Sequence, residues 1–238
     1  MNIALLTAAG NGNRMHQDIP KQFLHVDNKP VIIHTMEAFQ LHPSIDAMIV
    51  ITLESWSEVV WAYAKQFGIT KLRWVVPGGE TGQDSIRNGL DALKKELPDE
   101  DIVVMIHDGN RPLVTSEIIS DSFATFSKYG NAVAAIPCTE VVFESENGFS
   151  SCTSTEREKL FRTQTPHTYY LNDILNAHEE AAKRGIAGTA ASCMLMKELG
   201  QTTYFSKGSE ENIKITTPDD LKIFKAILHT RQEDWIKG

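Results

Sequence analysis

Residues 2–22 read NIALLTAAGNGNRMHQDIPKQ, and this stretch decides the fold class of the chain. Residues 2–7 are a short apolar run, and the next five, Ala-Ala-Gly-Asn-Gly, are small and turn-forming. That pattern is typical of a strand that ends in a loop. Small residues let the backbone approach a ligand closely, so that N–H groups can bind phosphate oxygens. We therefore expect either a phosphate-binding loop after the first strand or a plain strand-to-helix turn.

Spacing separates this loop from two better-known phosphate-binding motifs. The P-loop pattern G-x-x-x-x-G-K-[ST] is absent. The dinucleotide fingerprint G-x-G-x-x-G matches only at Gly10 and Gly12, because its third glycine position is Met15. What remains is a glycine loop that carries Arg14, with Lys21 close behind it. The mismatch counts against a dinucleotide-dependent oxidoreductase, which stays as an alternative.

Beyond this loop, short β-rich runs alternate with amphipathic helical stretches. We expect strands at residues 2–7, 47–53, 72–76, 102–106, 131–137, 202–206 and 212–216. We expect helices at residues 31–41, 55–67, 82–97, 115–129, 171–183, 190–199 and 217–235. Ser55 and Glu58 form a candidate capping box for the second helix. This alternation predicts a Rossmann-like α/β fold of three layers, a mostly parallel sheet with helices on both faces. Ligands are then expected at the carboxyl ends of the strands.

The rhythm changes at residues 138–165. This segment is rich in Glu, Ser, Thr and Asn and has no long apolar run. Loops of this length are uncommon inside a compact domain unless they carry a function. We therefore predict that residues 138–165 are either a β-hairpin arm or a long functional loop, which projects from a single domain spanning residues 1–238.

Composition and charge limit the possible functions. The chain has 238 residues, 42% of them hydrophobic, and a formal net charge of −8. Disorder is therefore not expected, and the acidic balance argues against a general nucleic-acid binder. Cys138, Cys152 and Cys193 lie far apart, which predicts reduced thiols. There is no signal-peptide pattern, and no run reaches the ~18–20 apolar residues of a membrane span. We expect a cytoplasmic protein without nucleic-acid or membrane partners.

A polar cluster follows the apolar run at residues 102–106. Asp108 stands at the expected carboxyl end of that strand, where a carboxylate suits Mg²⁺ shared with phosphate oxygens. Arg111 can bind a phosphate as a planar fork. Asp108 also has a plainer interpretation, a carboxylate that caps the loop. His107 is expected to be structural, because a histidine at a strand end usually bonds to the backbone.

Eight short motifs together resemble the cytidylyltransferases of the methylerythritol-phosphate and ribitol-phosphate family. They occur in the family's order and at its spacing across nearly the whole chain. They are Ala8-Ala9-Gly10-x-Gly12-x-Arg14-Met15, Pro20-Lys21-Gln22, Gly78-Gly79-Glu80, Asp84-Ser85, His107-Asp108, Arg111-Pro112, Gln164-Thr165-Pro166 and Asn212-Ile213-Lys214. The resemblance implies the fold of the nucleotide-diphospho-sugar transferases. It also implies transfer of CMP from CTP to a polyol phosphate, with Mg²⁺ or another divalent cation as cofactor.

The same resemblance assigns roles to individual residues. The catalytic cations would be Arg14, Lys21 and Lys214. The nucleotide would be bound by Ala8, Ala9, Gly10, Gly12, Gly78, Gly79, Ser85 and Gly109. The acceptor would be bound by Asp108, Arg111 and Arg157, with Asp108 also as the metal ligand. Phosphoryl transfer needs positioned cations more than a base, which is why these residue types suit the chemistry. A plain strand-to-helix turn at Ser85 remains open.

In the family, the arm reaches across a homodimer and its arginine touches the acceptor phosphate in the partner's active site. By the resemblance, residues 138–165 would be a dimerisation arm and Arg157 would serve the neighbouring subunit. The alternative is a solvated charge on an arm.

The chain departs from the family mainly on the acceptor side. Glu140-Val141 aligns with an Asp-Thr pair, and residues 188–192 (Gly-Thr-Ala-Ala-Ser) align with Thr-Asp-Glu-Ala-Ser. Gly82 aligns with an arginine, and Gly109-Asn110 replaces Ala-x. Sites that bond hydroxyl groups discriminate strongly by them. These differences favour ribitol 5-phosphate or a related surface-polysaccharide polyol phosphate, such as glycerol phosphate, over methylerythritol 4-phosphate. A non-catalytic protein that kept the fold is a further alternative.

Overall fold

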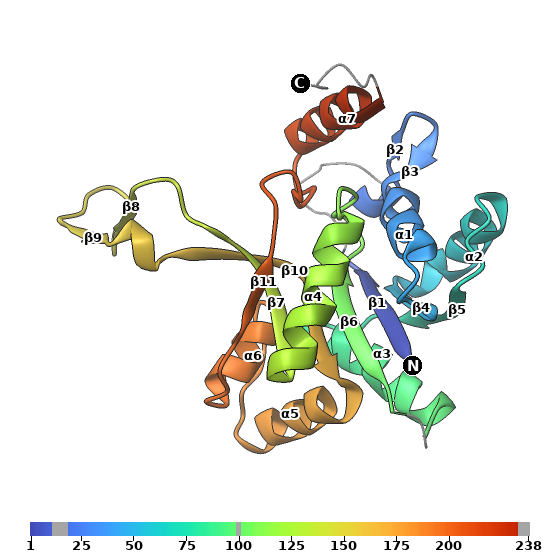
Figure 1. Cartoon of the computed structure of the whole chain (residues 1–238), viewed down its shortest axis with the longest axis horizontal. Coiled ribbons are helices and arrows are strands. Elements are labelled where there is room, and N and C mark those ends of the chain that lie inside the picture. Colours follow the sequence, from blue (N-terminus) through green and yellow to red (C-terminus); the bar gives the residue numbers. More distant parts are fainter. Residues whose placement is uncertain (11–18, 99–100, 233–238) are drawn as a thin grey trace.

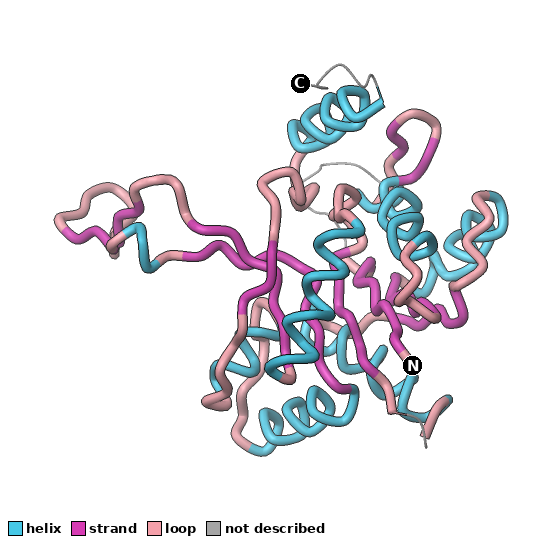
Figure 2. Tube along the Cα trace, viewed as in Figure 1, coloured by secondary structure: helices cyan, strands magenta, loops and turns pink. Residues whose placement is uncertain are grey.

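The computed structural model describes residues 1–10, 19–98 and 101–232. Gly12 and Arg14, two of the predicted loop residues, lie outside the described residues. In the described part, a seven-stranded sheet forms the centre of the molecule (Figures 1 and 2). Its order is β11 (Phe205–Lys207), β7 (Asn131–Pro137), β10 (Phe161–Tyr170), β6 (Val103–Asp108), β1 (Asn2–Ala8), β4 (Ala47–Thr52) and β5 (Leu72–Pro77).

Only β10 runs against its neighbours in this sheet. It pairs antiparallel with β6 and β7, whereas the other described pairs of the seven-stranded sheet are parallel. The helices are α1 (Val31–Leu41), α2 (Ser57–Gln66), α3 (Gly82–Glu96), α4 (Ser116–Tyr129), α5 (Leu171–Lys183), α6 (Ser192–Glu198) and α7 (Pro218–Gln232). The predicted mostly parallel sheet is confirmed, and most ends of the elements that were expected agree to within one or two residues, but no strand was expected where β10 lies.

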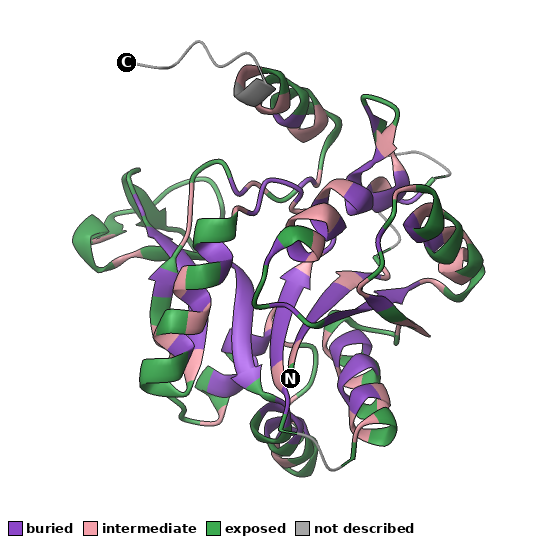
Figure 3. Cartoon of the chain, turned by 45° about the vertical axis from the view of Figure 1, so that its right-hand side comes forward, coloured by how far each residue is buried: buried purple, intermediate pink, exposed green. Residues whose placement is uncertain are grey.

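Two apolar layers cover the sheet because neighbouring strand residues point to opposite faces. Leu6 and Val50 pack in one cluster with residues of α1, α2 and α4. Leu5 and Ile51 pack in the other with residues of α3, α5 and α6. All four strand residues are completely buried, which explains why these strands read as continuous apolar runs. Figure 3 shows the buried sheet between helices with exposed outer faces. The predicted three layers are confirmed.

The predicted capping box at Ser55 and Glu58 is wrong. A short 3-10 helix, η3 (Glu54–Trp56), comes first, and α2 begins after Trp56 without a side-chain cap hydrogen bond. The box forms one helix later instead, where Thr81 and Asp84 cap α3 reciprocally. The Ser-x-x-Glu pattern alone did not distinguish a 3-10 turn from the first turn of an α-helix.

The strand predicted at residues 212–216 is also wrong. This segment is irregular in the structure, and Ile215 is buried against Val26, Val31 and Phe224 instead of pairing in the sheet. The alternation of apolar and polar residues therefore reflects packing beneath α7 and not strand pairing. The start of α7 was predicted correctly, and the side chain of Asp220 accepts hydrogen bonds from the backbone of Thr216 and Thr217.

The projecting arm is real but shorter than predicted. It contains the antiparallel strands β8 (Val142–Glu144) and β9 (Thr153–Thr155) and a 3-10 helix, η4 (Arg157–Lys159). Figure 1 shows it extending away from the body of the molecule. Residues 161–165 belong to the central sheet, because β10 pairs with β7 from Phe161 onward. The first residues of β10 are polar like those of the arm, so the sequence did not indicate where the arm ends. None of the helices in the described ranges has the length and apolar content to cross a bilayer.

Candidate active site

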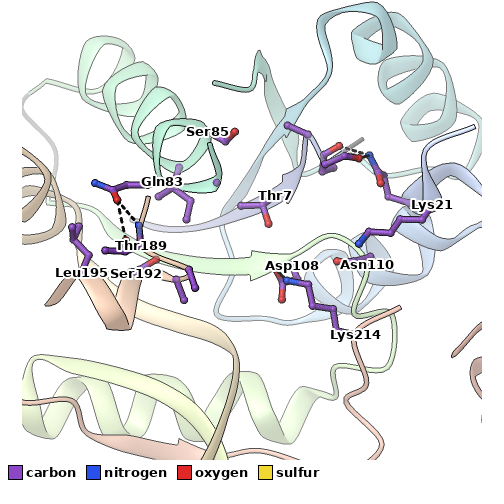
Figure 4. A pocket seen from close by; sticks show the side chains of 18 of the residues that line it. Thr7, Lys21, Gln83, Ser85, Asp108, Asn110, Thr189, Ser192, Leu195 and Lys214 are labelled. Atoms are coloured by element: carbon purple, nitrogen blue, oxygen red, sulfur yellow. Dashed lines mark hydrogen bonds and ion pairs between the residues drawn. The ribbon is translucent and has the colours of Figure 1, made fainter. Parts of the chain in front are cut away.

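A cavity of about 220 Å³ lies at the carboxyl ends of β1 and β6 (Figure 4). Parallel sheets expose their loops at this edge, and ligands bind there. The first turns of α3, the start of α6 with the loop before it, and single residues of other elements also line it, among them Lys21, His178 and Lys214. The sequence-predicted site residues that line it are Ala8, Ala9, Gly10, Lys21, Ser85, Asp108 and Lys214. Thus the cavity unites residues from both ends of the chain.

Asp108 is the centre of the charged side of the cavity. Its carboxylate accepts a hydrogen bond from Nε of Arg111 at 2.9 Å and another from Nζ of Lys214 at 2.9 Å. Burial by itself would raise the pKa of Asp108, but Lys214 and Arg111 outweigh it and hold that pKa well below its usual range. The carboxylate is therefore ionised and fixes the direction of both cations.

Two asparagines hold the segment that carries Lys214. Asn110 donates its side-chain amide to the carbonyl of Ile215, and the Ile215 N–H donates to the Asn110 carbonyl at 2.9 Å. Asn212 is completely buried and donates to the carbonyl of Thr165 at 2.9 Å. These hydrogen bonds hold residues 212–216 in position, although the segment does not pair with a strand of the sheet. They place Lys214 above the end of β6.

Lys21 comes from the short 3-10 helix η2 (Lys21–Phe23) and lines the same side of the cavity. Its neighbour Gln22 is buried and donates its side-chain amide to the carbonyls of Ala8 and Gly10. Gln22 therefore ties η2 to the loop that follows β1. Figure 4 shows Lys21, Asp108 and Lys214 together at one end of the cavity. Cations outnumber carboxylates here, which suits an anionic ligand in a chain of net negative charge.

His107 has the structural role predicted for it. Its ring is completely buried, Nε2 donates to the carbonyl of Arg111 at 3.2 Å, and Nδ1 accepts from the Thr165 hydroxyl at 3.0 Å. Burial lowers the pKa of His107 to about 3, so that it is neutral near pH 7. The residue holds the turn after β6 in place and does not reach the cavity.

The predicted glycines allow close approach within the chain. A Cβ on Gly78 would lie 2.4 Å from the Cβ of Ala9, and one on Gly109 would lie 3.0 Å from the carbonyl oxygen of Thr7. Both glycines thus let neighbouring loops pack against the end of β1. Neither lines the cavity, nor does Gly79.

Ser85 lines the cavity, but its hydroxyl is engaged in the turn. Oγ accepts from the N–H of Gly79 at 3.0 Å and donates to the carbonyl of Thr81 at 2.9 Å. Both hydrogen bonds are those expected of a plain strand-to-helix turn. Contact of Ser85 with a nucleotide remains a prediction.

Two predicted acceptor ligands lie outside the cavity wall. The guanidinium of Arg111 donates hydrogen bonds to the carboxylate of Asp108 and, at 2.7 Å, to the carbonyl of Asn212. Arg157 lies on the exposed arm and bonds to the carbonyl of Thr139. Within one subunit, the structure therefore brings neither guanidinium to the cavity.

The wall opposite Asp108 includes residues 189–192 of the run aligned with the family, but sequence reasoning missed its Gln83 and His178. Gln83 at the start of α3 accepts hydrogen bonds from the backbone N–H and the hydroxyl of Thr189, at 2.9 Å and 3.0 Å. It also donates to the carbonyl of Ile186 at 3.3 Å. His178 and Ser192 lie on this wall as well. No local signal could have paired residues that stand 106 positions apart in the chain.

A mostly parallel sheet, with a small-residue loop after its first strand and lysines gathered at a strand-end carboxylate, defines an α/β enzyme that handles phosphates. The fold is that of a solved 4-diphosphocytidyl-2C-methyl-D-erythritol synthase from Anaerococcus prevotii, with a TM-score of 0.82 over 96% of both chains at 22% identity. The sequence model of the IspD family, described as 2-C-methyl-D-erythritol 4-phosphate cytidylyltransferase, matches residues 2–230. The chain belongs to this family and is a nucleotidyltransferase.

Curated relatives carry two different names. A ribitol-5-phosphate cytidylyltransferase of Lacticaseibacillus paracasei is 41% identical over 98% of this chain and 100% of its own. A 2-C-methyl-D-erythritol 4-phosphate cytidylyltransferase of Clostridium botulinum is 40% identical over 95% of this chain and 97% of its own. Family membership removes the oxidoreductase alternative, but the two identities are too similar to choose the acceptor.

Proposed function

We propose that this chain transfers CMP from CTP to ribitol 5-phosphate, giving CDP-ribitol and pyrophosphate. The observation that carries the proposal is the convergence of Lys21 and Lys214 at Asp108, at the edge of the sheet where ligands bind. In this reaction an acceptor phosphate oxygen attacks the α-phosphorus of CTP, and the bond to the β-phosphate oxygen breaks. Lysines placed beforehand stabilise the charge that develops on the transferred group.

In the proposed reaction, Lys21, Lys214 and Asp108 each have a defined role. Lys214 lies on Asp108 and meets the reacting phosphates from one side, while Lys21 meets them from η2. Asp108 stays ionised and keeps Lys214 aimed at the cavity. No side chain of this cluster has to accept a proton, because a phosphate oxygen is already ionised at neutral pH.

A divalent cation fits the site only as a partner of the substrate phosphates. Among the described residues, no group of three or more His, Cys, Asp or Glu side chains could hold a metal. Asp108 supplies one carboxylate, and Mg²⁺ commonly takes one or two carboxylates together with phosphate oxygens. We propose Asp108 as its protein ligand. The cation would neutralise charge on the triphosphate.

The acceptor is proposed from the wall that departs from the family pattern. Thr189 and Ala190 line the cavity where the methylerythritol-phosphate enzymes carry two acids, and Glu140-Val141 replaces their Asp-Thr pair. These changes fall on the acceptor side and leave the nucleotide side almost intact. The substitutions therefore support an acceptor other than methylerythritol 4-phosphate and the same nucleotide, CTP.

We also propose a homodimer formed through the arm. Val141, Phe143 and Phe149 are 72%, 60% and 94% exposed, which is unusual for side chains of their size. Exposed apolar groups gathered on one projection favour burial against a partner. Arg157 sits on this arm, away from the cavity of its own subunit, as expected of a residue that serves a neighbour.

Pyrophosphate release tests the proposed function. The enzyme is mixed with CTP and Mg²⁺ and, in turn, with ribitol 5-phosphate, 2-C-methyl-D-erythritol 4-phosphate and sn-glycerol 3-phosphate. We expect the highest kcat/KM with ribitol 5-phosphate. A tenfold advantage for methylerythritol phosphate would overturn the acceptor, and no release with any of the three would overturn the reaction.

A further inference from the structure

The motif residue Gln164 is buried next to the segment that carries Lys214. It lies on β10, is 8% exposed and does not line the cavity. Its side-chain amide donates to the carbonyl of Ser209 at 2.7 Å, and its Oε1 accepts from the N–H of the same residue at 3.1 Å. Oε1 also accepts from the side-chain amide of Asn212 at 3.3 Å. One side chain thus binds both ends of residues 209–212.

The loop lies tightly against Gln164. A Cβ on Gly208 would stand 2.7 Å from Oε1 of Gln164 and 2.9 Å from the carbonyl oxygen of Ala135. Both distances are shorter than a Cβ tolerates, so glycine is required for this close approach. The loop is therefore fixed by close packing as well as by hydrogen bonds.

The backbone of Lys214 is anchored on both sides. On its C-terminal side, Ile215 exchanges hydrogen bonds with Asn110. On its N-terminal side, Asn212 bonds to Gln164. The lysine side chain itself is a flexible stem and stays 42% exposed, so the place of its ammonium group depends on where the backbone is held. A shift of about 1 Å in a group that meets reacting phosphates can cost about 100-fold in rate.

The bonding pattern of Gln164 favours positioning over general support of the core. A buried amide has to be desolvated, and an apolar side chain would fill the same space on β10 at a lower cost. Among the described residues, the hydrogen bonds of this side chain all go to the loop before Lys214. They therefore stabilise the place of one segment and not the pairing of the sheet.

We propose that Gln164 is a positioning residue of the transfer reaction, which holds Lys214 at the reacting phosphates by fixing residues 208–212. This inference rests on the proposed function, because that function gives Lys214 its role at the phosphates. Gln164 touches neither substrate and acts through Lys214 alone. Its loss should lower kcat and leave KM for CTP nearly unchanged, as for an interaction made only in the transition state.

A double-mutant cycle between Gln164 and Lys214 tests this. Gln164→Met keeps the length of the side chain and removes its amide. Pyrophosphate release gives kcat for the wild type, the two single variants and the double variant, with whichever polyol phosphate the wild type uses best. We expect Gln164→Met to lower kcat about tenfold to thirtyfold in the wild type. In the Lys214→Ala background it should lower kcat less than twofold, because the group that it positions is gone.

Asn131→Leu is the matched control. Asn131 holds another loop in the same manner, since its side chain donates to the carbonyl of Thr202 at 2.9 Å and accepts from the N–H of Tyr204 at 3.1 Å. It lies at the start of β7 and not on the cavity wall. This variant should lower the melting temperature about as much as Gln164→Met, but it should change kcat less than twofold in both backgrounds.

A second variant keeps the test decisive if Gln164→Met does not fold. Gln164→Asn retains a buried amide that is one methylene too short to bond Ser209 and Asn212 together. It should show the same dependence on Lys214, with a smaller loss of kcat.

Three results would overturn the inference. The loss of kcat could be equal in both backgrounds, KM for CTP could rise without a fall in kcat, or Asn131→Leu could show the same dependence on Lys214. Failure of the proposed function would be visible in the wild type instead, as no release of pyrophosphate with any polyol phosphate. That result would overturn both.

Discussion

At the scale of single residues, the site depends on how Asp108 divides its carboxylate between two cations. Arg111 takes one oxygen and is held in turn by the carbonyl of Asn212. Lys214 takes the other oxygen and stays 42% exposed, open to the cavity. One cation therefore braces the carboxylate and the other remains available to a ligand.

Replacing Lys214 by alanine should separate catalysis from stability. We expect kcat/KM to fall by about 10²–10³-fold, the usual cost of one charge-stabilising group. The free energy of unfolding should fall by only about 1 kcal/mol, since Asp108 keeps its ion pair with Arg111. Lys207→Ala is the control, because Lys207 also pairs with a carboxylate, that of Glu117, but far from the cavity. A loss of stability without a loss of turnover would contradict the assignment.

Buried histidines should make the fold sensitive to mild acid. Burial lowers the pKa of His107 to about 3 and that of His167 to about 4, from 6.5 in the unfolded chain. At pH values between the folded-state pKa and 6.5, the unfolded chain binds more protons than the folded chain. The free energy of unfolding therefore rises with pH in this range. On acidification from pH 6.5 to 5, each such histidine should cost up to about 2 kcal/mol. Urea unfolding at fixed ionic strength measures this, and equal midpoints at pH 7 and 5 would contradict it.

At the scale of elements, α3 joins the two halves of the cavity. Its capped first turn follows the glycine turn, and Gln83 in that same turn holds Thr189 and Ile186. The loop that precedes α6 thus takes its position from the helix beside the proposed nucleotide segment.

Gln83→Ala should therefore act on the acceptor. If residues 186–192 bind the acceptor, we expect KM for the acceptor to rise about fivefold to tenfold and KM for CTP to change less than twofold, because three hydrogen bonds that hold this loop are lost. Gln40→Ala is the matched control, since Gln40 also bonds a loop, at Thr70 and Lys71, away from the cavity. A rise of KM for CTP in steady-state kinetics would show that Gln83 positions the nucleotide instead.

Elements with strong local signals were predictable, and those shaped by distant partners were not. The apolar run of β4 and the spacing of α5 identify their elements because burial alone selects such patterns. The irregular segment at 212–216 looked like a strand because Ile215 is buried by α7, a fact that no local pattern contains. For the same reason, Asp108 and Lys214 were found through their motifs, whereas Gln83 and His178 were not.

At the scale of the whole molecule, the arm leaves and rejoins the sheet beside the strand that ends at Asp108. It starts after β7 and returns as β10, and β10 pairs with β6. Figure 1 shows that it nevertheless points away from the body. The side chain of Arg157 is about half exposed there, and among the described residues it contacts Glu158 and the carbonyl of Thr139, each at 3.4 Å. An arm rooted next to one site but aimed elsewhere suits exchange between two subunits.

Mixing two inactive variants tests this exchange. Arg157→Ala and Lys214→Ala should each be nearly inactive alone, if a complete site combines Lys214 of one subunit with Arg157 of the partner subunit. In a mixed dimer, the subunit that retains Lys214 faces a partner that retains Arg157, so one of two sites is intact. Random mixing in equal amounts then restores about a quarter of the wild-type rate, because half of the dimers are mixed.

The control for this experiment is Lys159→Ala, which removes another exposed charge from the same 3-10 helix and should stay active. If Arg157 acts within its own subunit, every site of the mixture lacks one of the two cations and no activity returns. Pyrophosphate release before and after subunit exchange therefore distinguishes the two arrangements. A return of activity would also require a dimer, since separate monomers have no means of sharing a side chain.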